Sequence, residues 1–141
     1  MSFTAIILAA GKGTRMNSAL PKPLHRVGGH AMLAWSMDAA RLAGAERIVT
    51  VLAPGSEDIQ DWLDGAPFAI QEDQLGTGNA VASAREAVGN EDGVAIVMFA
   101  DTPLVSAASL KQLADGVKAG AGIVIAGFRP DDPSGYGRLV E

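Results

Sequence analysis

The chain alternates short runs of apolar residues with longer segments in which apolar residues recur at helical spacing. Apolar runs predict strands at residues 4–9, 47–52, 68–71, 94–99 and 123–126. The first run is continuous and leads into Gly-x-Gly, which is typical of a strand buried on both faces of a parallel sheet.

The segments between these runs predict helices. One spans residues 30–43 and stops at Gly44, and a second is capped by Ser56 and runs to about residue 63. A third opens at Thr77 or Gly78 and ends at residues 89–90, and a fourth runs from its cap at Ser106 through residue 118. Strand and helix alternate with short loops, which indicates an α/β fold with a mostly parallel sheet and helices on both faces.

The end of the chain differs from the rest. Residues 128–141 are rich in turn formers, and the last five, Gly-Arg-Leu-Val-Glu, have a pattern typical of the start of another strand. We expect a domain that is truncated at its C-terminus; the alternative is a native edge strand that ends the fold.

Composition bounds the class of protein. The 141 residues amount to one domain or a piece of a larger one, and 48% hydrophobic with 19% charged residues suits a soluble globular core. The chain has no cysteine, which excludes disulfides and thiolate metal sites. It has no apolar run of about 20 residues, and its first residues make a poor signal peptide. We expect a cytoplasmic enzyme or binding module that has no membrane association.

Charge is distributed unevenly along the chain. Lys12, Arg15, Lys22 and Arg26 precede the first carboxylate, Asp38, whereas the rest of the chain carries 7 basic and 16 acidic residues. That balance argues against a nucleic-acid-binding face, which needs positive charge spread over a surface. A local positive loop in an acidic protein suits a small anion, and chance clustering on a solvated loop is the alternative.

The glycine-containing loop after the first strand fails two phosphate-binding templates. Gly11-Lys12-Gly13-Thr14 lacks the spacing of a P-loop. The dinucleotide fingerprint needs a third glycine where Met16 stands, and no acidic residue follows the second strand.

A third template matches. Residues 8–16, Leu-Ala-Ala-Gly-Lys-Gly-Thr-Arg-Met, followed by Leu-Pro-Lys-Pro-Leu, resemble the signature of sugar-nucleotide pyrophosphorylases. Residues 71–81 (QEDQLGTGNAV), 98–104 (MFADTPL) and 134–140 (SGYGRLV) resemble segments of the bacterial bifunctional N-acetylglucosamine-1-phosphate uridyltransferase/glucosamine-1-phosphate acetyltransferase family. The four motifs are in the family's order and cover nearly the whole chain, as the N-terminal part of such a protein. The resemblance implies a Rossmann-like, three-layer nucleotidyltransferase fold.

The resemblance also implies roles for individual residues. Arg15 and Lys22 match catalytic positions that bind phosphates, and Asp101, directly after the strongest strand, matches the ligand of Mg²⁺. The remaining matches are expected to bind nucleotide or sugar: Leu8, Ala9, Ala10, Gly11, Gly13, Thr14, Gln71, Gly76, Thr77, Phe99, Ala100 and Gly137. Phe99 and Ala100 stand where the family has Tyr and Gly, so the added methyl of Ala100 narrows the approach for a ligand.

Three of these matches have alternatives. Gln71 matches the residue that reads uracil, because an amide donates and accepts at once, and Gln74 is its rival for this role. Asp101 can instead form an Asx turn before Pro103, and Lys22 can be an exposed turn residue. His25 and His30 are expected to be structural or surface residues.

The implied reaction is Mg²⁺-dependent transfer of UMP from UTP to N-acetylglucosamine 1-phosphate, which gives UDP-N-acetylglucosamine for cell-wall and lipopolysaccharide synthesis, and pyrophosphate. Residues that the family uses for the acetamido sugar, and the acetyltransferase β-helix through which full-length members trimerise, have no counterpart in residues 1–141. We expect weak UTP binding and little or no turnover by this chain. The alternatives are a related enzyme with another base or acceptor, and a non-catalytic nucleotide-binding module.

Overall fold

Four parallel strands form the central sheet. The computed structural model describes residues 3–11, 13, 16–89, 93–137 and 139. The strand order is β5-β4-β1-β6, made by β1 (Phe3–Leu8), β4 (Ala45–Leu52), β5 (Phe68–Ile70) and β6 (Val94–Phe99). Every pairing in this sheet is parallel, and Leu8 lies between Val51 and Phe99. The carboxyl ends of β1, β4 and β6 therefore meet at one edge, as the parallel sheet predicted from the sequence requires.

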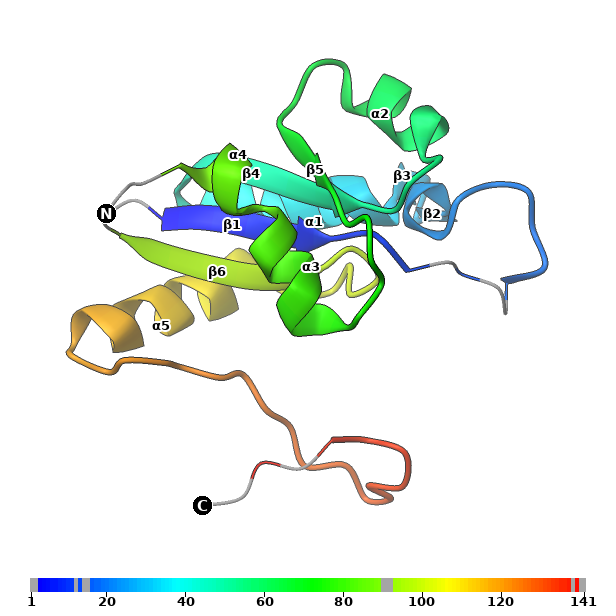
Figure 1. Cartoon of the computed structure of the whole chain (residues 1–141). Coiled ribbons are helices and arrows are strands. Elements are labelled where there is room, and N and C mark those ends of the chain that lie inside the picture. The colour runs from blue at the N-terminus through cyan, green and yellow to red at the C-terminus, as the bar shows by residue number, and fades with distance from the viewer. Residues whose placement is uncertain (1–2, 12, 14–15, 90–92, 138, 140–141) are drawn as a thin grey trace.

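Helices cover both faces of the sheet, which confirms the predicted α/β class. They are α1 (Met32–Ala43), α2 (Glu57–Leu63), α3 (Thr77–Ser83), α4 (Arg85–Val88) and α5 (Ala107–Lys118). Figure 1 shows α3 and α4 in front of the sheet, α1 behind it, and α5 beside β6. The Ser106 hydroxyl caps α5 by accepting from the Ser109 N–H, and Gly44 ends α1 at a φ of 100°.

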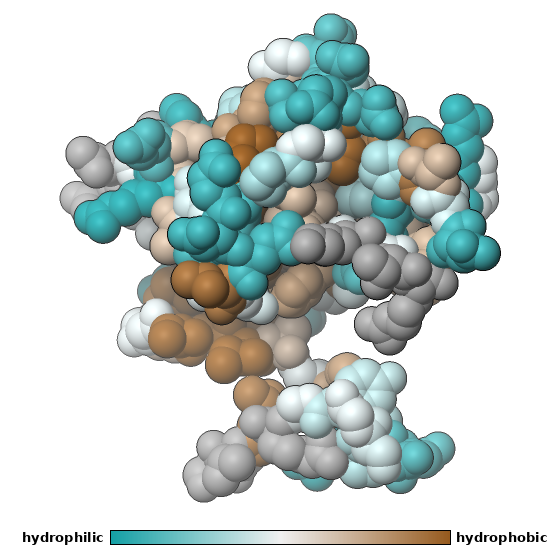
Figure 2. Space-filling view, turned by 45° about the vertical axis from the view of Figure 1, so that its right-hand side comes forward, coloured by the Kyte–Doolittle hydropathy of each residue, from teal (hydrophilic) through white to brown (hydrophobic). Residues whose placement is uncertain are grey.

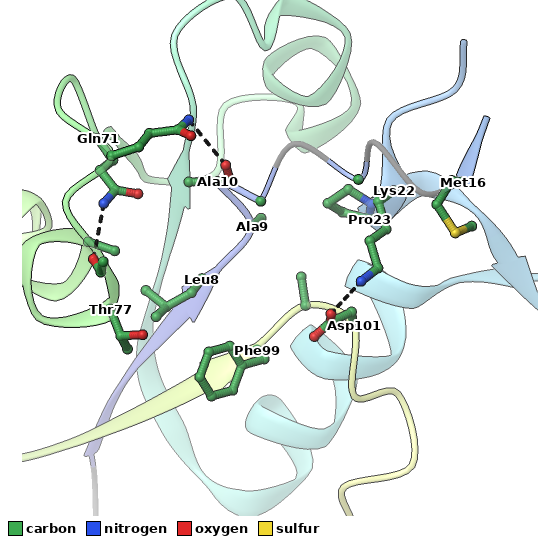
Figure 3. A pocket seen from close by; sticks show the side chains of 16 residues that line it. Leu8, Ala9, Ala10, Met16, Lys22, Pro23, Gln71, Thr77, Phe99 and Asp101 are labelled. Atoms are coloured by element: carbon green, nitrogen blue, oxygen red, sulfur yellow. Dashed lines mark hydrogen bonds and ion pairs between the residues drawn. The ribbon is translucent and has the colours of Figure 1, made fainter. Parts of the chain in front are cut away.

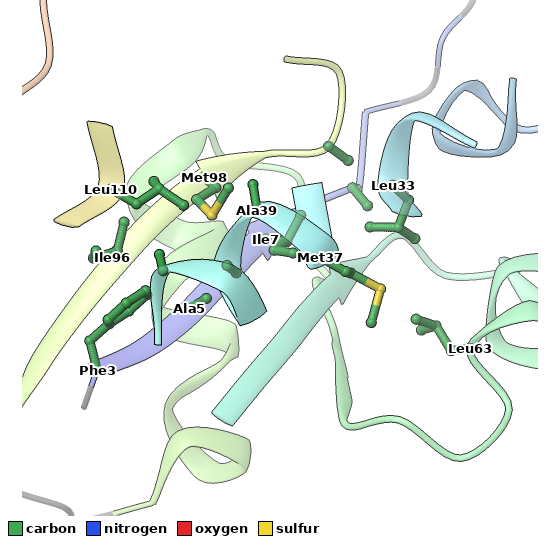
Figure 4. Packing of buried hydrophobic residues seen from close by; sticks show 14 of the residues in the cluster. Phe3, Ala5, Ile7, Leu33, Met37, Ala39, Leu63, Ile96, Met98 and Leu110 are labelled. Atoms are coloured by element: carbon green, nitrogen blue, oxygen red, sulfur yellow. The ribbon is translucent and has the colours of Figure 1, made fainter. Parts of the chain in front are cut away.

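Alternation along β1 divides the core into two clusters. Ala5 and Ile7 face α1 and α5, whereas Ile6 packs with residues of β4, α3 and α4 on the opposite face. Figure 4 shows Ile7 between the strands and Met37 of α1. Complete burial of a side chain such as Ile7 stabilises the fold by about 1.5–3 kcal/mol.

A short hairpin precedes α1 and was not predicted from the sequence. It consists of β2 (Arg26–Val27) and β3 (His30–Ala31), and it follows a 3-10 helix, η2 (Lys22–Leu24). Gly28 and Gly29 have φ values of 60° and 82°, which suit a two-residue hairpin turn. Because His30 and Ala31 pair with Val27 and Arg26, α1 begins at Met32 rather than at His30. The Trp35 indole N–H donates to the Val27 carbonyl at 2.8 Å and joins the helix to the hairpin.

The predicted helix after Thr77 is interrupted. The structure divides this segment into α3 and α4 at Ala84, which ends the first helix and caps the second.

The prediction of a fifth strand at residues 123–126 is wrong. These residues have no regular secondary structure, and Ile123 and Ile125 are exposed. A strand needs a partner for its backbone hydrogen bonds. Here Val124 packs instead on α5, so closely that a Cβ added at Gly116 would lie only 2.8 Å from Val124 Cγ2. The segment is therefore attached to a helix and not to the edge of β6.

The remainder of the described tail lies below the sheet and α5 in Figure 1 and forms the lower lobe of the space-filling view in Figure 2. Phe128 and Tyr136 stack edge to face with ring centroids 5.0 Å apart. Of the strand expected at residues 137–141, Gly137 and Leu139 are irregular, and the other three residues lie outside the described part. Among the described residues no helix is long and apolar enough to cross a membrane.

Candidate nucleotide-binding site

A cleft of about 500 Å³ opens at the carboxyl edge of the sheet. Three segments supply its walls: the loop after β1, the loop between β5 and α3, and the turn after β6 (Figure 3). This is where open parallel sheets bind ligands, because loops from adjacent strands converge there. Most of the residues predicted to bind nucleotide line it, namely Leu8, Ala9, Ala10, Gly11, Gly13, Lys22, Gln71, Gly76, Thr77, Phe99, Ala100 and Asp101.

The loop after β1 is fixed to the sheet at its start. The Ala9 N–H donates to the Val51 carbonyl at 2.8 Å, and the side chain of Gln74 donates to the Ala10 carbonyl at 3.3 Å. Gly13 has a φ of 57°, and a Cβ there would lie 2.8 Å from Lys22 Cβ. Glycine is therefore required by both backbone conformation and space. Lys12, Thr14 and Arg15 lie outside the described residues.

Lys22 and Asp101 form an ion pair in the lining of the cleft. Lys22 Nζ lies 2.6 Å from Asp101 Oδ2, and both side chains remain at least one-third exposed. Lys22 begins η2, whose position is fixed because Met32 N–H donates to the His25 carbonyl at 2.9 Å. The pair brings a cation and a carboxylate to the same end of the cleft, where both are accessible to a ligand.

Hydrogen bonds fix the turn that carries Asp101. The Ala100 N–H donates to the Leu8 carbonyl at 3.0 Å, which joins the turn to β1. The Phe99 carbonyl accepts from the hydroxyls of Thr102 at 2.9 Å and of Ser36 at 3.3 Å. Ser36 is a buried residue of α1, so this helix supports the turn from behind.

Gln71 closes the other end of the cleft. Its side chain is only 4% exposed, and its amide nitrogen donates to the Gly76 carbonyl at 3.2 Å and to Asn79 Oδ1 at 2.8 Å. This differs from the predicted arrangement, in which the amide both donates to and accepts from a base. Both of its N–H groups are used inside the protein.

Gly137 does not line the cleft and belongs to the tail. His25 and His30 are also outside the lining; His25 Nε2 lies 3.1 Å from the Leu20 carbonyl, and His30 Nε2 lies 3.2 Å from Asp38 Oδ2. Within the described ranges no three His, Asp or Glu side chains gather as a ready metal site.

Sequence reasoning missed three lining residues, Met16, Pro23 and Ala80, and named Gln74 only as the rival of Gln71. Met16 and Pro23 lie within the quoted motifs, so the signal was present. Ala80 is one apolar position in a helix, and its sequence context does not distinguish it from an ordinary core residue.

The family model for the MobA-like NTP transferase domain matches residues 5–137. The chain belongs to this family. The match includes all the described segments that wall the cleft.

Curated relatives carry one name. Proteins from Maricaulis maris and Xanthobacter autotrophicus, both called "Bifunctional protein GlmU", are 45% and 46% identical over 99% of this chain. A third, from Parvibaculum lavamentivorans, is 44% identical over 96% of it. The chain spans about a third of the length of these relatives, 31% to 32%. These identities confirm the resemblance to this family that the sequence motifs indicated.

Solved structures share the fold. The structure of Rv0371c from Mycobacterium tuberculosis H37Rv superposes with a TM-score of 0.69 at 24% identity, over 84% of this chain and 62% of that one. A UDP-glucose pyrophosphorylase from Acinetobacter baumannii gives a TM-score of 0.69 at 20% identity, over 85% and 54%. A manganese complex of Rv0371c gives 0.63 at 26% identity, over 83% and 60%. These neighbours extend beyond the part of the fold that this chain shares with them.

Proposed function

We propose that residues 1–141 form the nucleotide-binding part of a uridyltransferase domain that transfers UMP from UTP to N-acetylglucosamine 1-phosphate. The observation that carries the proposal is the cleft itself, which has the Lys22–Asp101 pair at one end and the Gln71 amide at the other. A nucleoside triphosphate likewise carries charged phosphates at one end and a hydrogen-bonding base at the other. The choice of uridine and of the amino sugar rests on the family that the sequence motifs resemble.

In this reaction a phosphate oxygen of the sugar phosphate attacks the α-phosphorus of UTP. The bond from that phosphorus to the β-phosphate oxygen breaks, and pyrophosphate leaves with the electron pair. The attacking oxygen is already anionic, so no protein base or nucleophile is needed. The chain's part is to hold the triphosphate in line and to balance its charge through Lys22 and Arg15.

Asp101 fits a magnesium ligand. Its carboxylate is accessible, and the Lys22 ammonium, 2.6 Å away, occupies a place that a cation takes at such an oxygen. Mg²⁺ is commonly held by one or two carboxylates together with phosphate oxygens and water, so a single aspartate is sufficient when nucleotide is bound. The metal would neutralise charge on the phosphates during transfer.

Direct binding measurements test the proposal. Calorimetry with UTP, CTP, GTP and UDP-N-acetylglucosamine in Mg²⁺ should show preference for the uridine nucleotides, and charge reversal at Arg15 or Lys22 should abolish it without unfolding the chain. Preference for another base would contradict the assignment to uridine. Survival of UTP affinity in both reversed variants would contradict the phosphate site.

A second candidate is a module that binds nucleotide without turning it over. It is favoured by the position of Gly137, the residue expected to contact the sugar, which lies outside the lining. We expect this chain alone to bind UTP weakly and to release little or no pyrophosphate. Steady Mg²⁺-dependent release from UTP and the sugar phosphate would contradict this second candidate.

We further propose that the protein acts in cell-wall and lipopolysaccharide precursor synthesis in the cytoplasm, by analogy with the relatives. The acetyltransferase part that the resemblance implies would lie in the two-thirds of the relatives' length that this chain does not span.

A further inference from the structure

The amide of Gln71 is held in one orientation by groups outside its own strand. Its backbone N–H donates to the Leu52 carbonyl at 2.8 Å, which places the residue at the carboxyl end of β5. Its side-chain nitrogen has two acceptors, the Gly76 carbonyl at 3.2 Å and Asn79 Oδ1 at 2.8 Å. A backbone carbonyl only accepts, so the amide atom that faces Gly76 must be the nitrogen.

The same contacts use both N–H groups of the amide. What remains for a ligand is Oε1, a hydrogen-bond acceptor. In Figure 3 the Gln71 nitrogen is directed toward the start of α3, near Thr77, and the oxygen lies on the side of the cleft. Gln71 lines the cleft and is 4% exposed, so a base edge that contacts it is largely removed from water.

The Gly76 carbonyl is itself held in place. Gly76 has a φ of 110° and a ψ of −175°, a conformation open in practice only to glycine, and it is the N-cap of α3. Its carbonyl also accepts from the Ala80 N–H at 3.0 Å. Asn79, one turn into the same helix, supplies the second acceptor, so the first turn of α3 orients the glutamine amide.

We propose that Asn79 is a positioning residue that fixes Gln71 as an acceptor, and that the site thereby selects a base with an N–H at its pairing edge. Uracil presents its N3–H there, whereas N3 of cytosine is an acceptor and would face Oε1 without a proton between them. An unpaired, desolvated acceptor is costly, so the preference arises from rejection of cytosine as much as from the bond to uracil. This inference rests on the proposed function, because it assumes that the base lies against Gln71.

Three nucleotide analogues test the acceptor. Calorimetry of the full chain with Mg²⁺ should give at least about tenfold tighter binding of UTP than of CTP or of N3-methyl-UTP, since both lack the N3–H. 4-Thio-UTP keeps that N–H and weakens only the acceptor at position 4, so its affinity should stay within about threefold of that of UTP. A large loss with 4-thio-UTP and little loss with N3-methyl-UTP would show that Gln71 donates, and would overturn the inference.

Two variants test the role of Asn79. Asn79→Leu removes the acceptor and frees one N–H of Gln71, so the ratio of UTP to CTP affinity should fall several-fold while the Tm shows that the chain is folded. Asn79→Asp keeps an acceptor oxygen; both affinities should fall together through added negative charge, with their ratio preserved. An unchanged ratio in Asn79→Leu would exclude Asn79 as the positioning residue.

The outcomes separate the inference from the function beneath it. Equal affinity of the unaltered chain for UTP and CTP overturns selection by Gln71 and leaves nucleotide binding intact. No affinity for any nucleotide overturns both.

Discussion

Lys22 Nζ and Asp101 Oδ2 lie 2.6 Å apart, although 79 residues separate them in the sequence. The pair joins η2, at the end of the glycine loop, to the turn after β6. Both side chains are partly exposed, so the pair contributes little to folding stability. It does leave a cation and a carboxylate side by side in the lining of the cleft, and the proposed function uses one for the nucleotide and the other for its metal. The proposed function requires a nucleotide with its metal to separate the two charges, with Lys22 moving to phosphate and Asp101 to the metal.

Replacement of Lys22 tests the phosphate end of the cleft. Lys22→Met keeps most of the aliphatic stem and removes the ammonium, and we expect UTP affinity to fall at least about tenfold because a charge-assisted hydrogen bond contributes roughly 1.5–3 kcal/mol. Calorimetry with Mg²⁺ measures the change. Lys111→Met, on the exposed side of α5, is the matched control and should bind UTP as the unaltered chain does. Equal affinity in the two variants would remove Lys22 from the site.

Replacement of Asp101 tests the metal. Asp101→Asn keeps the shape of the side chain and removes its charge, so nucleotide binding should be weak and should no longer respond to Mg²⁺. The unaltered chain should lose UTP affinity when EDTA removes the metal. Titrations with and without EDTA measure both effects, and Asp131→Asn, exposed in the tail, is the control. A variant at Asp101 that still responds to Mg²⁺ would place the metal elsewhere.

Gly13 should be required for stability of the glycine loop. Gly13→Ala places a methyl at a φ of 57° and 2.8 Å from Lys22 Cβ, so we expect the free energy of unfolding to fall by about 1–2 kcal/mol. Gly11→Ala is the matched control, because a Cβ there meets nothing within 4 Å and its φ is not positive. It should change stability by less than about 0.5 kcal/mol. Urea denaturation followed by circular dichroism distinguishes the two, and equal losses would contradict this account of the loop.

Thr50 should limit the stability of the sheet. Thr50 is fully buried in β4. Among the described residues, its hydroxyl is the buried side-chain polar group that has no hydrogen-bond partner. Thr50→Val replaces that hydroxyl with a methyl of similar size, so unfolding should cost about 1 kcal/mol more. Thr50→Ser keeps the hydroxyl and loses a methyl, and should cost about 1 kcal/mol less. Thermal melts measure both shifts, and a lower Tm for the valine variant would show that the hydroxyl does have a partner.

Local pattern was sufficient for the regular elements of the sheet. Residues 94–99 form β6, as expected from their apolar run, although one face of this strand, with Val97 and Phe99, stays exposed. Ser106 caps α5 and Gly44 ends α1, since these are short-range effects of side chain and backbone. The hairpin at residues 26–31 was missed because two-residue strands leave almost no periodicity to read.

The strand expected at residues 123–126 shows where such reasoning fails. Its apolar pattern is that of a strand, but a strand is completed by a partner, and in the structure Val124 packs on α5 at Gly116. Contacts with residues distant in the sequence decide whether an apolar segment pairs with a sheet edge or packs on a helix. The pattern of the segment itself does not predict which of the two occurs.

The sequence by itself determined the parallel α/β class, the family motifs and most of the residues that line the cleft, because strands and the loops that follow them are adjacent in the chain. Only the tertiary structure decided how those residues meet. It paired Lys22 with Asp101, directed both N–H groups of Gln71 into the first turn of α3, and left Gly137 out of the lining. The physical reason is that hydrogen bonds and ion pairs depend on distances between loops from different strands, and strand order sets those distances.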